Sequence, residues 1–298
     1  MKKAFLQLHV AVFLAGFTAI LGKLITLNEG LLVWYRLLIT ALTLALLLYF
    51  KRELEILSFN KSIRIFAVGS IVALHWVCFY GSIRYSNISV ALTCLSAMGF
   101  FTAIFEPLIL KRRLDAIEIL LGLLAIAGIY LIFDFYPQYK LGILFGVISA
   151  LLASVFPILN IPLLKNNSPK TLALYQMSGG FLALSLIIPF YLKFFPAVYY
   201  LPSTTDWLWL LVLAWFCTVL SFILQLNSLK RISPFTSSLT YNLEPVYGII
   251  LAFVIFHENK FLTPEFYYGL ALILLAVILQ TGRMFLSLNK KTINKTYA

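Results

Sequence analysis

Apolar residues occur in long, unbroken runs along the whole chain. Ten runs of about 20 residues alternate with short polar segments, at 4–24, 31–50, 64–83, 88–110, 114–133, 141–163, 171–192, 207–229, 234–256 and 264–286. At about 1.5 Å per helical residue, each run can cross a hydrocarbon core about 30 Å thick. Because the runs are continuous and do not alternate, they exclude an outer-membrane barrel. The pattern predicts an all-α integral membrane protein with ten transmembrane helices.

The composition supports this prediction. Of the 298 residues, 62% are hydrophobic and 11% are charged, and the mean hydropathy is +0.96. Soluble domains are usually about 25% charged. The opening MKKAFLQLHVAVFLAGFTA resembles a signal peptide, but no small-x-small cleavage site follows it. We therefore interpret residues 4–24 as the first span.

The excess of basic residues indicates topology. If ten spans start from an inner N-terminus, 17 of the 23 Lys and Arg residues lie in inner segments and 5 in outer ones, with Arg36 at the outer mouth of the second span. The positive-inside rule then places both termini in the cytoplasm. We expect a multi-pass protein of the cell inner (plasma) membrane that has no nucleic-acid partner.

Signals for catalysis are weak. All three cysteines fall inside spans, and the three histidines lack metal-ligand spacing. The chain carries no phosphate loop, dinucleotide fingerprint or nucleophile elbow. The sequence therefore predicts no metal, no cofactor and no catalytic residue, so the protein is not expected to be an enzyme.

The two halves of the chain resemble each other. A shift of 146 residues aligns FYGSIRYSNISVA, which starts at Phe79, with QLNSLKRISPFTS, which starts at Gln225. Further along, LLGLLAIAGIYLIF from Leu120 resembles YYGLALILLAVILQ from Tyr267. We predict a tandem repeat, with a first five-helix unit over residues 1–137 and a second over residues 138–298, which includes a short cytoplasmic tail.

Five spans per unit would place the two units in opposite orientations. The charges agree, because the basic segment KRRL after the fourth span corresponds to the much less basic HENKFL after the ninth. Inverted repeats are common in transporters, whose substrate site lies near the midplane between the repeats. The sequence thus predicts two inverted five-helix repeats around a central cavity.

Small and polar residues form seams along four of the predicted helices. In the ninth span they follow a three-and-four spacing, which places them on one side of a helix. The seams contain Ser237, Thr240, Tyr241, Glu244, Tyr247 and Gly248; Ser89, Thr93, Ser96, Gly99, Ala103 and Glu106; Thr218, Ser221, Gln225 and Ser228; and His75, Phe79 and Ser82. Such residues also serve helix packing in membranes, so both packing and ligand binding remain open for the hydroxyl groups.

Glu244 is the strongest functional candidate. The helical rise places it about 15 Å from the start of its span, near the bilayer centre. An ionisable group there costs at least about 2.5 kcal/mol and usually faces a wet cavity or a partner. Glu106 has the same neighbouring proline but lies only four residues before Leu110. It is therefore either a coupling group or an interfacial ion-pair partner of the basic residues 111–113.

A proline follows each of these acids. Pro245 cannot donate to the carbonyl of Tyr241, and Pro107 cannot donate to that of Ala103. We therefore expect a kink and a free acceptor in each helix. A carboxylate beside a released carbonyl suits an ammonium group or a proton, and a simple packing kink is the alternative.

Other polar and aromatic residues complete the candidate site. Arg36 either snorkels to the surface or faces the cavity, where it would attract a carboxylate. Its counterpart by position in the second repeat is Gln176, which follows Tyr175 as Arg36 follows Tyr35. The predicted binding residues are Arg36, His75, Trp76, Tyr80, Ser96, Tyr175, Gln225, Tyr241, Asn242 and Glu244, with Glu244 and Glu106 as candidate coupling groups.

Several segments together resemble one known family. The second span begins WYRLLITAL, GSIRYSNISVAL leads into the fourth, and ISPFTSSLTYNLEPVYGIILAFVIFHENKFLTPEFYYG covers the ninth and the start of the tenth. With the ten-span inverted repeat, they resemble the EamA-type permeases of the drug/metabolite transporter superfamily. The resemblance covers nearly the whole chain and depends on no single motif. Because the first repeat has KRRL where the second has HENK, the family's loop glutamate is carried over to Glu258 only.

The resemblance implies a basket in which spans 1–4 and 6–9 surround a central cavity, while spans 5 and 10 lie to one side. It also implies export of small metabolites such as amino acids. We expect a secondary transporter that works by alternating access on a small-molecule substrate within the lipid bilayer, with a homodimer left open. The alternatives are a membrane-embedded enzyme acting on lipid or prenyl substrates, a passive channel or a scramblase.

Overall fold

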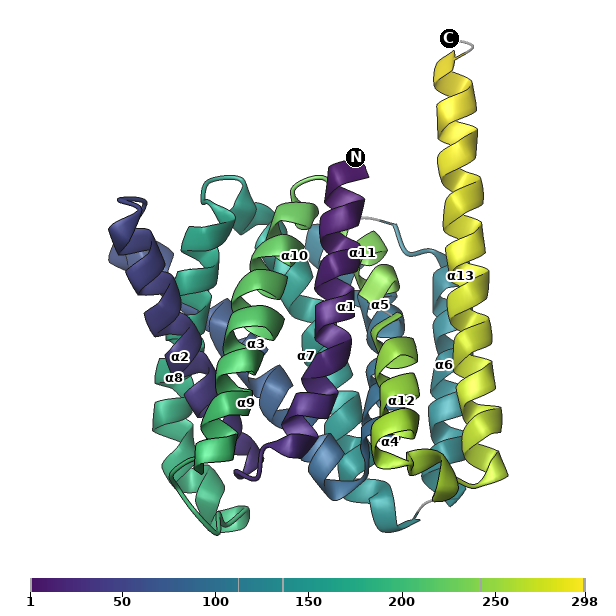
Figure 1. The fold of residues 1–298 in the computed structure, drawn as a ribbon. Coiled ribbons are helices and arrows are strands. Elements are labelled where there is room, and N and C mark those ends of the chain that lie inside the picture. The colour runs from purple at the N-terminus through teal and green to yellow at the C-terminus, as the bar shows by residue number, and fades with distance from the viewer. Residues whose placement is uncertain (1, 112, 136, 242, 297–298) are drawn as a thin grey trace.

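The computed structural model describes residues 2–111, 113–135, 137–241 and 243–296. They form helices that pack side by side and are joined by short connections (Figure 1). The first half forms α1 (Lys2–Leu24), α2 (Glu29–Phe50), α3 (Phe59–Tyr85), α4 (Ile88–Leu95), α5 (Met98–Leu110) and α6 (Ala116–Phe135). The second half forms α7 (Lys140–Leu164), α8 (Pro169–Phe194), α9 (Thr204–Ala214), α10 (Ser221–Leu229), α11 (Pro234–Tyr241), α12 (Leu243–Phe256) and α13 (Pro264–Thr296).

Each of the ten predicted runs coincides with one helix or with consecutive helices. Among the residues that the structure describes, seven helical segments are long and apolar enough to cross a membrane. The other three runs contain the shorter apolar helices Ile119–Leu131, Leu243–Phe256 and Pro264–Ala276. The prediction of an all-α membrane protein is confirmed.

The first helices of the two halves run in opposite directions. In Figure 1, α1 descends from the N-terminus at the top of the view, whereas α7 rises from the bottom. Outside these helices, α6 packs mainly against α13, and this pair stands at one side of the bundle (Figure 1). The remaining helices form the basket expected from the two-repeat architecture.

The fourth span is interrupted inside the bundle. It is divided at Ser96 and Ala97 between α4 and α5, and both residues are buried. Helix ends carry unpaired backbone groups, which a membrane tolerates only inside protein or beside water. The interruption therefore lies in the interior of the basket.

The prolines that follow the two acids both lie within helical segments. Pro107 lies in the last turn of α5, and Pro245 lies in α12 directly after Glu244. The kinks expected at these prolines stay predictions.

Glycines bring α3 and α8 into backbone contact. A Cβ atom on Gly69 would lie 2.0 Å from the carbonyl oxygen of Gln176, and one on Gly179 would lie 2.4 Å from the Cα atom of Phe66. Because any larger residue would force the helices apart, these small residues determine their spacing. This contact joins the two repeats.

A buried acid joins the repeats at the end opposite the N-terminus. The Glu258 carboxylate accepts hydrogen bonds from the backbone N–H groups of Ile88 (3.1 Å) and Ser89 (2.9 Å) and from the Ser89 hydroxyl (2.7 Å). It thus satisfies the free N–H groups at the start of α4 and interacts favourably with the helix dipole. The loop after α12 is thereby fixed to the broken fourth span.

Two further acids link the halves at the same end. Asp206 accepts hydrogen bonds from the N–H (2.7 Å) and hydroxyl (2.9 Å) of Thr26. Glu29 accepts one from the hydroxyl of Tyr191 and pairs with Arg84 at 3.6 Å. Charge-assisted hydrogen bonds are stronger than neutral ones. Three carboxylates therefore fasten the first repeat to the second at this end.

We expect the substitution Glu258→Gln to lower the free energy of unfolding by about 2 kcal/mol, because a neutral amide binds the α4 N-terminus less strongly. Thermal unfolding of the purified protein in detergent measures the loss. The control is Glu53→Gln. Lys170 lies 2.6 Å from the Glu53 carboxylate and lowers its pKa, but this pair is exposed and screened by solvent. Equal destabilisation of the two variants would contradict the capping role of Glu258.

Candidate functional site

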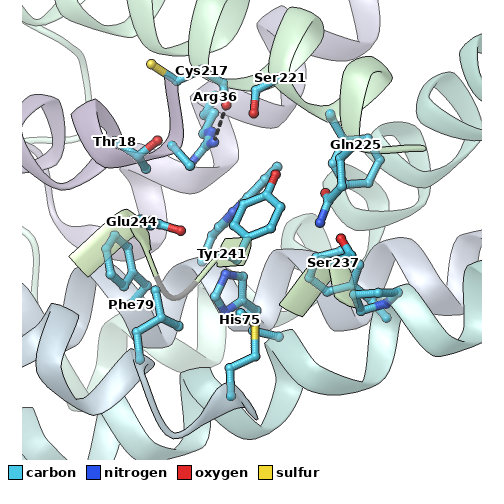
Figure 2. Close-up of a pocket in the computed structure, with 18 residues that line it drawn as sticks. Thr18, Arg36, His75, Phe79, Cys217, Ser221, Gln225, Ser237, Tyr241 and Glu244 are labelled. Atoms are coloured by element: carbon cyan, nitrogen blue, oxygen red, sulfur yellow. Dashed lines mark hydrogen bonds between the residues drawn. The ribbon is translucent and has the colours of Figure 1, made fainter. Parts of the chain in front are cut away.

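A cavity of about 70 Å³ lies inside the basket (Figure 2). Its lining comes from α1 to α5, α7 and α10 to α12, and from a π-helical turn, Trp215–Leu220, between α9 and α10. Neither helix of the outer pair α6 and α13 contributes a described lining residue. The cavity is therefore formed by seven of the eight spans of the basket, and α8 contributes no described lining residue.

Positions related by the internal repeat face each other across this cavity. Five pairs of lining residues are 146 positions apart, namely His75 and Ser221, Trp76 and Phe222, Phe79 and Gln225, Leu95 and Tyr241, and Met98 and Glu244. Inverted repeats place their substrate sites at such an interface. The cavity therefore lies where the sequence predicts the binding site.

The two repeats contribute different chemistry to these pairs. The first repeat supplies mainly aromatic and apolar side chains, namely Trp76, Phe79, Leu95 and Met98. The second supplies mainly polar ones, namely Ser221, Gln225, Tyr241 and Glu244. Trp76, Phe79, Leu95 and Met98 thus form an apolar wall, but the division between the repeats is not strict, because Arg36 and His75 of the first repeat also line the cavity.

Arg36 is held inside the protein by neutral partners. Its side chain donates from Nε to the hydroxyl of Thr218 (2.7 Å), from Nη1 to the hydroxyl of Tyr80 (2.8 Å) and from Nη2 to the carbonyl of Cys217 (3.4 Å). The guanidinium carbon lies 3.7 Å from the centre of the Trp76 ring, a cation–π contact. Arg36 is only 1% exposed, so it does not snorkel to the surface. None of these partners cancels its charge.

Glu244 faces the same cavity without a hydrogen-bond donor among the residues described. Its charge interacts with that of Arg36, but the two side chains form no ion pair in the structure. Ser237 also lines the cavity, and its hydroxyl has no hydrogen-bond partner in the part of the chain that the structure describes. A buried polar group left unsatisfied costs about 1–3 kcal/mol. These groups, seen together in Figure 2, are therefore suited to a polar ligand or to water.

His75 is held at the cavity by Ser149. Its Nδ1 atom lies 2.9 Å from both the carbonyl oxygen and the hydroxyl of Ser149. The same hydroxyl donates to the backbone carbonyl of His75 (3.1 Å). The imidazole is flanked by the rings of Phe79 and Phe156. The orientation of the ring is therefore fixed.

The structure brings together most of the predicted binding residues. Six of them line the cavity, namely Arg36, His75, Trp76, Gln225, Tyr241 and Glu244. Tyr80 lies behind this lining, bonded to Arg36. Ser96 lies at the helix break, where its hydroxyl bonds to the carbonyl of Leu92 (3.3 Å). Asn242 lies outside the described residues.

Tyr175 lies away from this group. Its hydroxyl donates to the carbonyl of Glu55 (3.1 Å) and accepts from the N–H of Leu57 (2.9 Å). The tyrosine thus holds the connection between α2 and α3 against α8, and the structure places it outside the cavity lining. Glu106 is buried in α5 and is likewise absent from the described lining. Its coupling role stays a prediction.

Several lining residues were not indicated by the sequence. They come mainly from the first and sixth spans and the π-helical turn, namely Ala15, Thr18, Ala153, Phe156, Pro157 and Cys217. Met98 had a signal, because it is the repeat counterpart of Glu244. Thr18 had a weaker one, the small-residue spacing of 11, 15, 18 and 22 along the first span.

We expect Arg36→Lys to lower the free energy of unfolding by about 3 kcal/mol, although the charge is kept. An ammonium cannot reproduce the planar fork or the stacking on Trp76, so buried acceptors lose their donors. Thermal unfolding in detergent measures this effect. Arg64→Lys makes the same exchange at an exposed position and is the control. If Arg36→Lys were as stable as this control, the bonding of the guanidinium would not contribute to stability.

A membrane-spanning bundle of two repeats around an interior polar cavity has the architecture of a membrane transporter. The family model of the EamA-like transporter family matches residues 2–134 and 140–282. The chain belongs to this family, which is part of the drug/metabolite transporter superfamily. The match also shows that the architecture consists of two repeats.

Two comparisons agree with this assignment. The chain is 25% identical over 171 residues to an uncharacterized transporter of Archaeoglobus fulgidus, an alignment that covers 57% of this chain and 59% of that protein. The fold is also similar to a solved crystal structure, with a TM-score of 0.66 and 17% sequence identity over 94% of this chain and 97% of the other. The first match supports a transporter, and the second shows the fold alone.

Proposed function

We propose that this membrane protein is a secondary transporter that exports a small zwitterionic metabolite with an apolar substituent, such as an amino acid or a related compound, across the inner membrane. Glu244 binds the ammonium group of the substrate, and Arg36 binds its carboxylate. Gln225, Tyr241 and His75 surround the ligand and orient it. Transport proceeds by alternating access between the two repeats.

The observation that carries this proposal is a pair of opposite charges facing one cavity without contact. Three of the five N–H groups of the guanidinium have protein acceptors, so Arg36 retains donors for an anion. The Glu244 carboxylate has no donor among the described residues. A zwitterion supplies the missing group to each end. It also adds no net charge to a buried site, which limits the cost of desolvation.

The apolar wall supports the second part of the substrate description. Trp76, Phe79, Leu95 and Met98 offer aromatic and flexible apolar surface opposite the polar groups of the second repeat. Burial of apolar surface contributes roughly 25 cal/mol per Å². A ligand with an aliphatic or aromatic side chain would therefore bind more tightly than a wholly polar one.

The size of the cavity supports a mechanism in which the lining moves. A volume of about 70 Å³ holds roughly five water molecules, which is less than an amino acid requires. The repeats must therefore separate around the site to admit and release the substrate. A proton and the substrate's ammonium group would compete for Glu244, so the same carboxylate can exchange an outgoing substrate for an incoming proton.

We expect Glu244→Gln to abolish counterflow of the substrate in proteoliposomes. The amide of glutamine takes up no proton, and it has no negative charge with which to bind an ammonium group. The variant should elute as a folded protein. Glu106→Gln is the matched control, since it neutralises a buried acid that the described cavity lining does not include. It should lower stability and preserve transport per folded molecule. Undiminished counterflow in Glu244→Gln would remove this glutamate from the mechanism.

We expect leucine to raise the thermal midpoint of the purified protein more than 3-methylbutylamine, which lacks the carboxylate, or 4-methylpentanoate, which lacks the ammonium group. A ligand at a hundredfold its dissociation constant stabilises by about 2.7 kcal/mol. Glycine tests the apolar wall, because it keeps both charges and removes the side chain. Stabilisation by sugars or nucleosides and not by any amino acid would contradict the proposed substrate class.

A further inference from the structure

A second pocket, of about 240 Å³, lies at the end of the bundle opposite the N-terminus. It is formed by the last turn of α1 and the connection to α2, the first turns of α2 and the last turns of α3. In the topology that the basic residues predict, this end is extracellular. Its volume exceeds the 70 Å³ of the central cavity. The transport function proposed above assigns no role to this pocket.

The outer pocket continues along the same helix faces as the central cavity. On α2, Leu32 lines the outer pocket and Arg36 lines the cavity, and on α1 the same holds for Gly22 and Thr18. Residues four apart lie on one face of a helix, about 6 Å further along its axis. The two hollows are therefore consecutive along one side of the bundle.

Tyr80 lies between these two hollows. Its ring lines the outer pocket, while its hydroxyl accepts the hydrogen bond from Nη1 of Arg36, which lines the cavity. One turn earlier on α3, Trp76 stacks on the same guanidinium. The ring packs closely on α1, because a Cβ atom on Gly22 would lie only 2.1 Å from it. Only a glycine at this position leaves room for the ring.

The charges of the outer pocket favour an anion. Arg84 is balanced by Glu29, whose carboxylate also accepts a hydrogen bond from Tyr191. The exposed Lys23 also lines the pocket and forms no ion pair within the described part of the chain. One positive charge therefore remains uncompensated at the pocket.

We propose that the outer pocket is a second, external binding site for the carboxylate end of the transported ligand, and that Tyr80 is the gate between it and the central cavity. The hydrogen bond from Arg36 keeps the gate closed. A carboxylate first meets the N–H groups of Arg36 that have no acceptor. Two-point binding then needs parallel N–H groups on two guanidinium nitrogens, so the carboxylate displaces the phenol hydroxyl from Nη1, releases the ring and reaches Lys23. The identity of the ligand rests on the proposed function, whereas the position of the gate does not.

Ser237 lines the central cavity, and its hydroxyl has no hydrogen-bond partner within the described residues, so Ser237→Cys places a reporter thiol there that needs no substrate. The native cysteines Cys78, Cys94 and Cys217 are first replaced by alanine. A membrane-impermeant methanethiosulfonate reagent is then added to the outside of intact spheroplasts. We expect Tyr80→Phe, which keeps the ring and removes the hydroxyl, to increase the rate of modification at position 237 about tenfold. Unchanged modification in this variant would overturn the gate.

Two further variants separate gating from general loosening. Tyr85→Phe removes a hydroxyl from the same end of α3 that does not contact Arg36, and it should leave the rate unchanged. Gly22→Ala should increase the rate as Tyr80→Phe does, because the new methyl group displaces the ring, so it provides a second route to the same result. Equal increases in Tyr80→Phe and Tyr85→Phe would assign the effect to a loosened helix end and contradict the proposal.

The charge of the reagent tests the binding site. In the Tyr80→Phe background, the rates of a sulfonate-bearing and a trimethylammonium-bearing methanethiosulfonate are compared after normalisation to a free thiol. We expect Lys23→Gln to lower the ratio of the sulfonate rate to the ammonium rate about threefold. Lys193→Gln removes an exposed lysine from the same end of the bundle and should not change it. An unchanged ratio in Lys23→Gln would contradict the anionic site, whatever the transported substrate is.

Discussion

A permanent positive charge inside a bilayer must be surrounded by protein, and the arrangement around the cavity follows from this constraint at Arg36. The guanidinium receives acceptors from α3 and from the π-helical turn, together with the face of Trp76. A π-helical turn disturbs the regular hydrogen bonding of a helix and occurs often at functional sites. Here its Thr218 and Cys217 supply two of the three acceptors. The irregular backbone of the eighth span thus supplies hydrogen-bond acceptors to the buried guanidinium.

The repeat accounts for where the site lies, and its divergence accounts for what the site can bind. The inverted repeat brings equivalent positions of the two halves to one cavity, which the fourth and ninth spans both line. Two identical halves would suit only a symmetric ligand. In this chain Met98 occupies the position equivalent to Glu244, and Phe79 that equivalent to Gln225. The two halves can therefore bind different groups of one ligand.

The two ends of the bundle are fastened by different interactions. At the end opposite the N-terminus, Glu29, Asp206 and Glu258 each join the repeats through buried charge-assisted hydrogen bonds. At the other end, the Glu53–Lys170 pair is exposed and screened, and Tyr175 joins α8 to the connection between α2 and α3 through neutral hydrogen bonds. Interactions of unequal strength favour one closed end over the other, and a bound ligand can shift this balance only by binding the two states differently.

The sequence by itself determined the spans, the repeat, the mid-membrane acid and the family resemblance, because these depend on local hydrophobicity and on spacing along the chain. Only the tertiary structure decided that Arg36 faces inward among neutral partners, that Tyr175 lies at the bundle end and that the fourth span is interrupted at Ser96 and Ala97. In a soluble helix the buried face is the apolar one, but lipid is as apolar as a protein interior. The pattern along a membrane helix therefore does not reveal which face turns inward, and contacts between distant segments decide it.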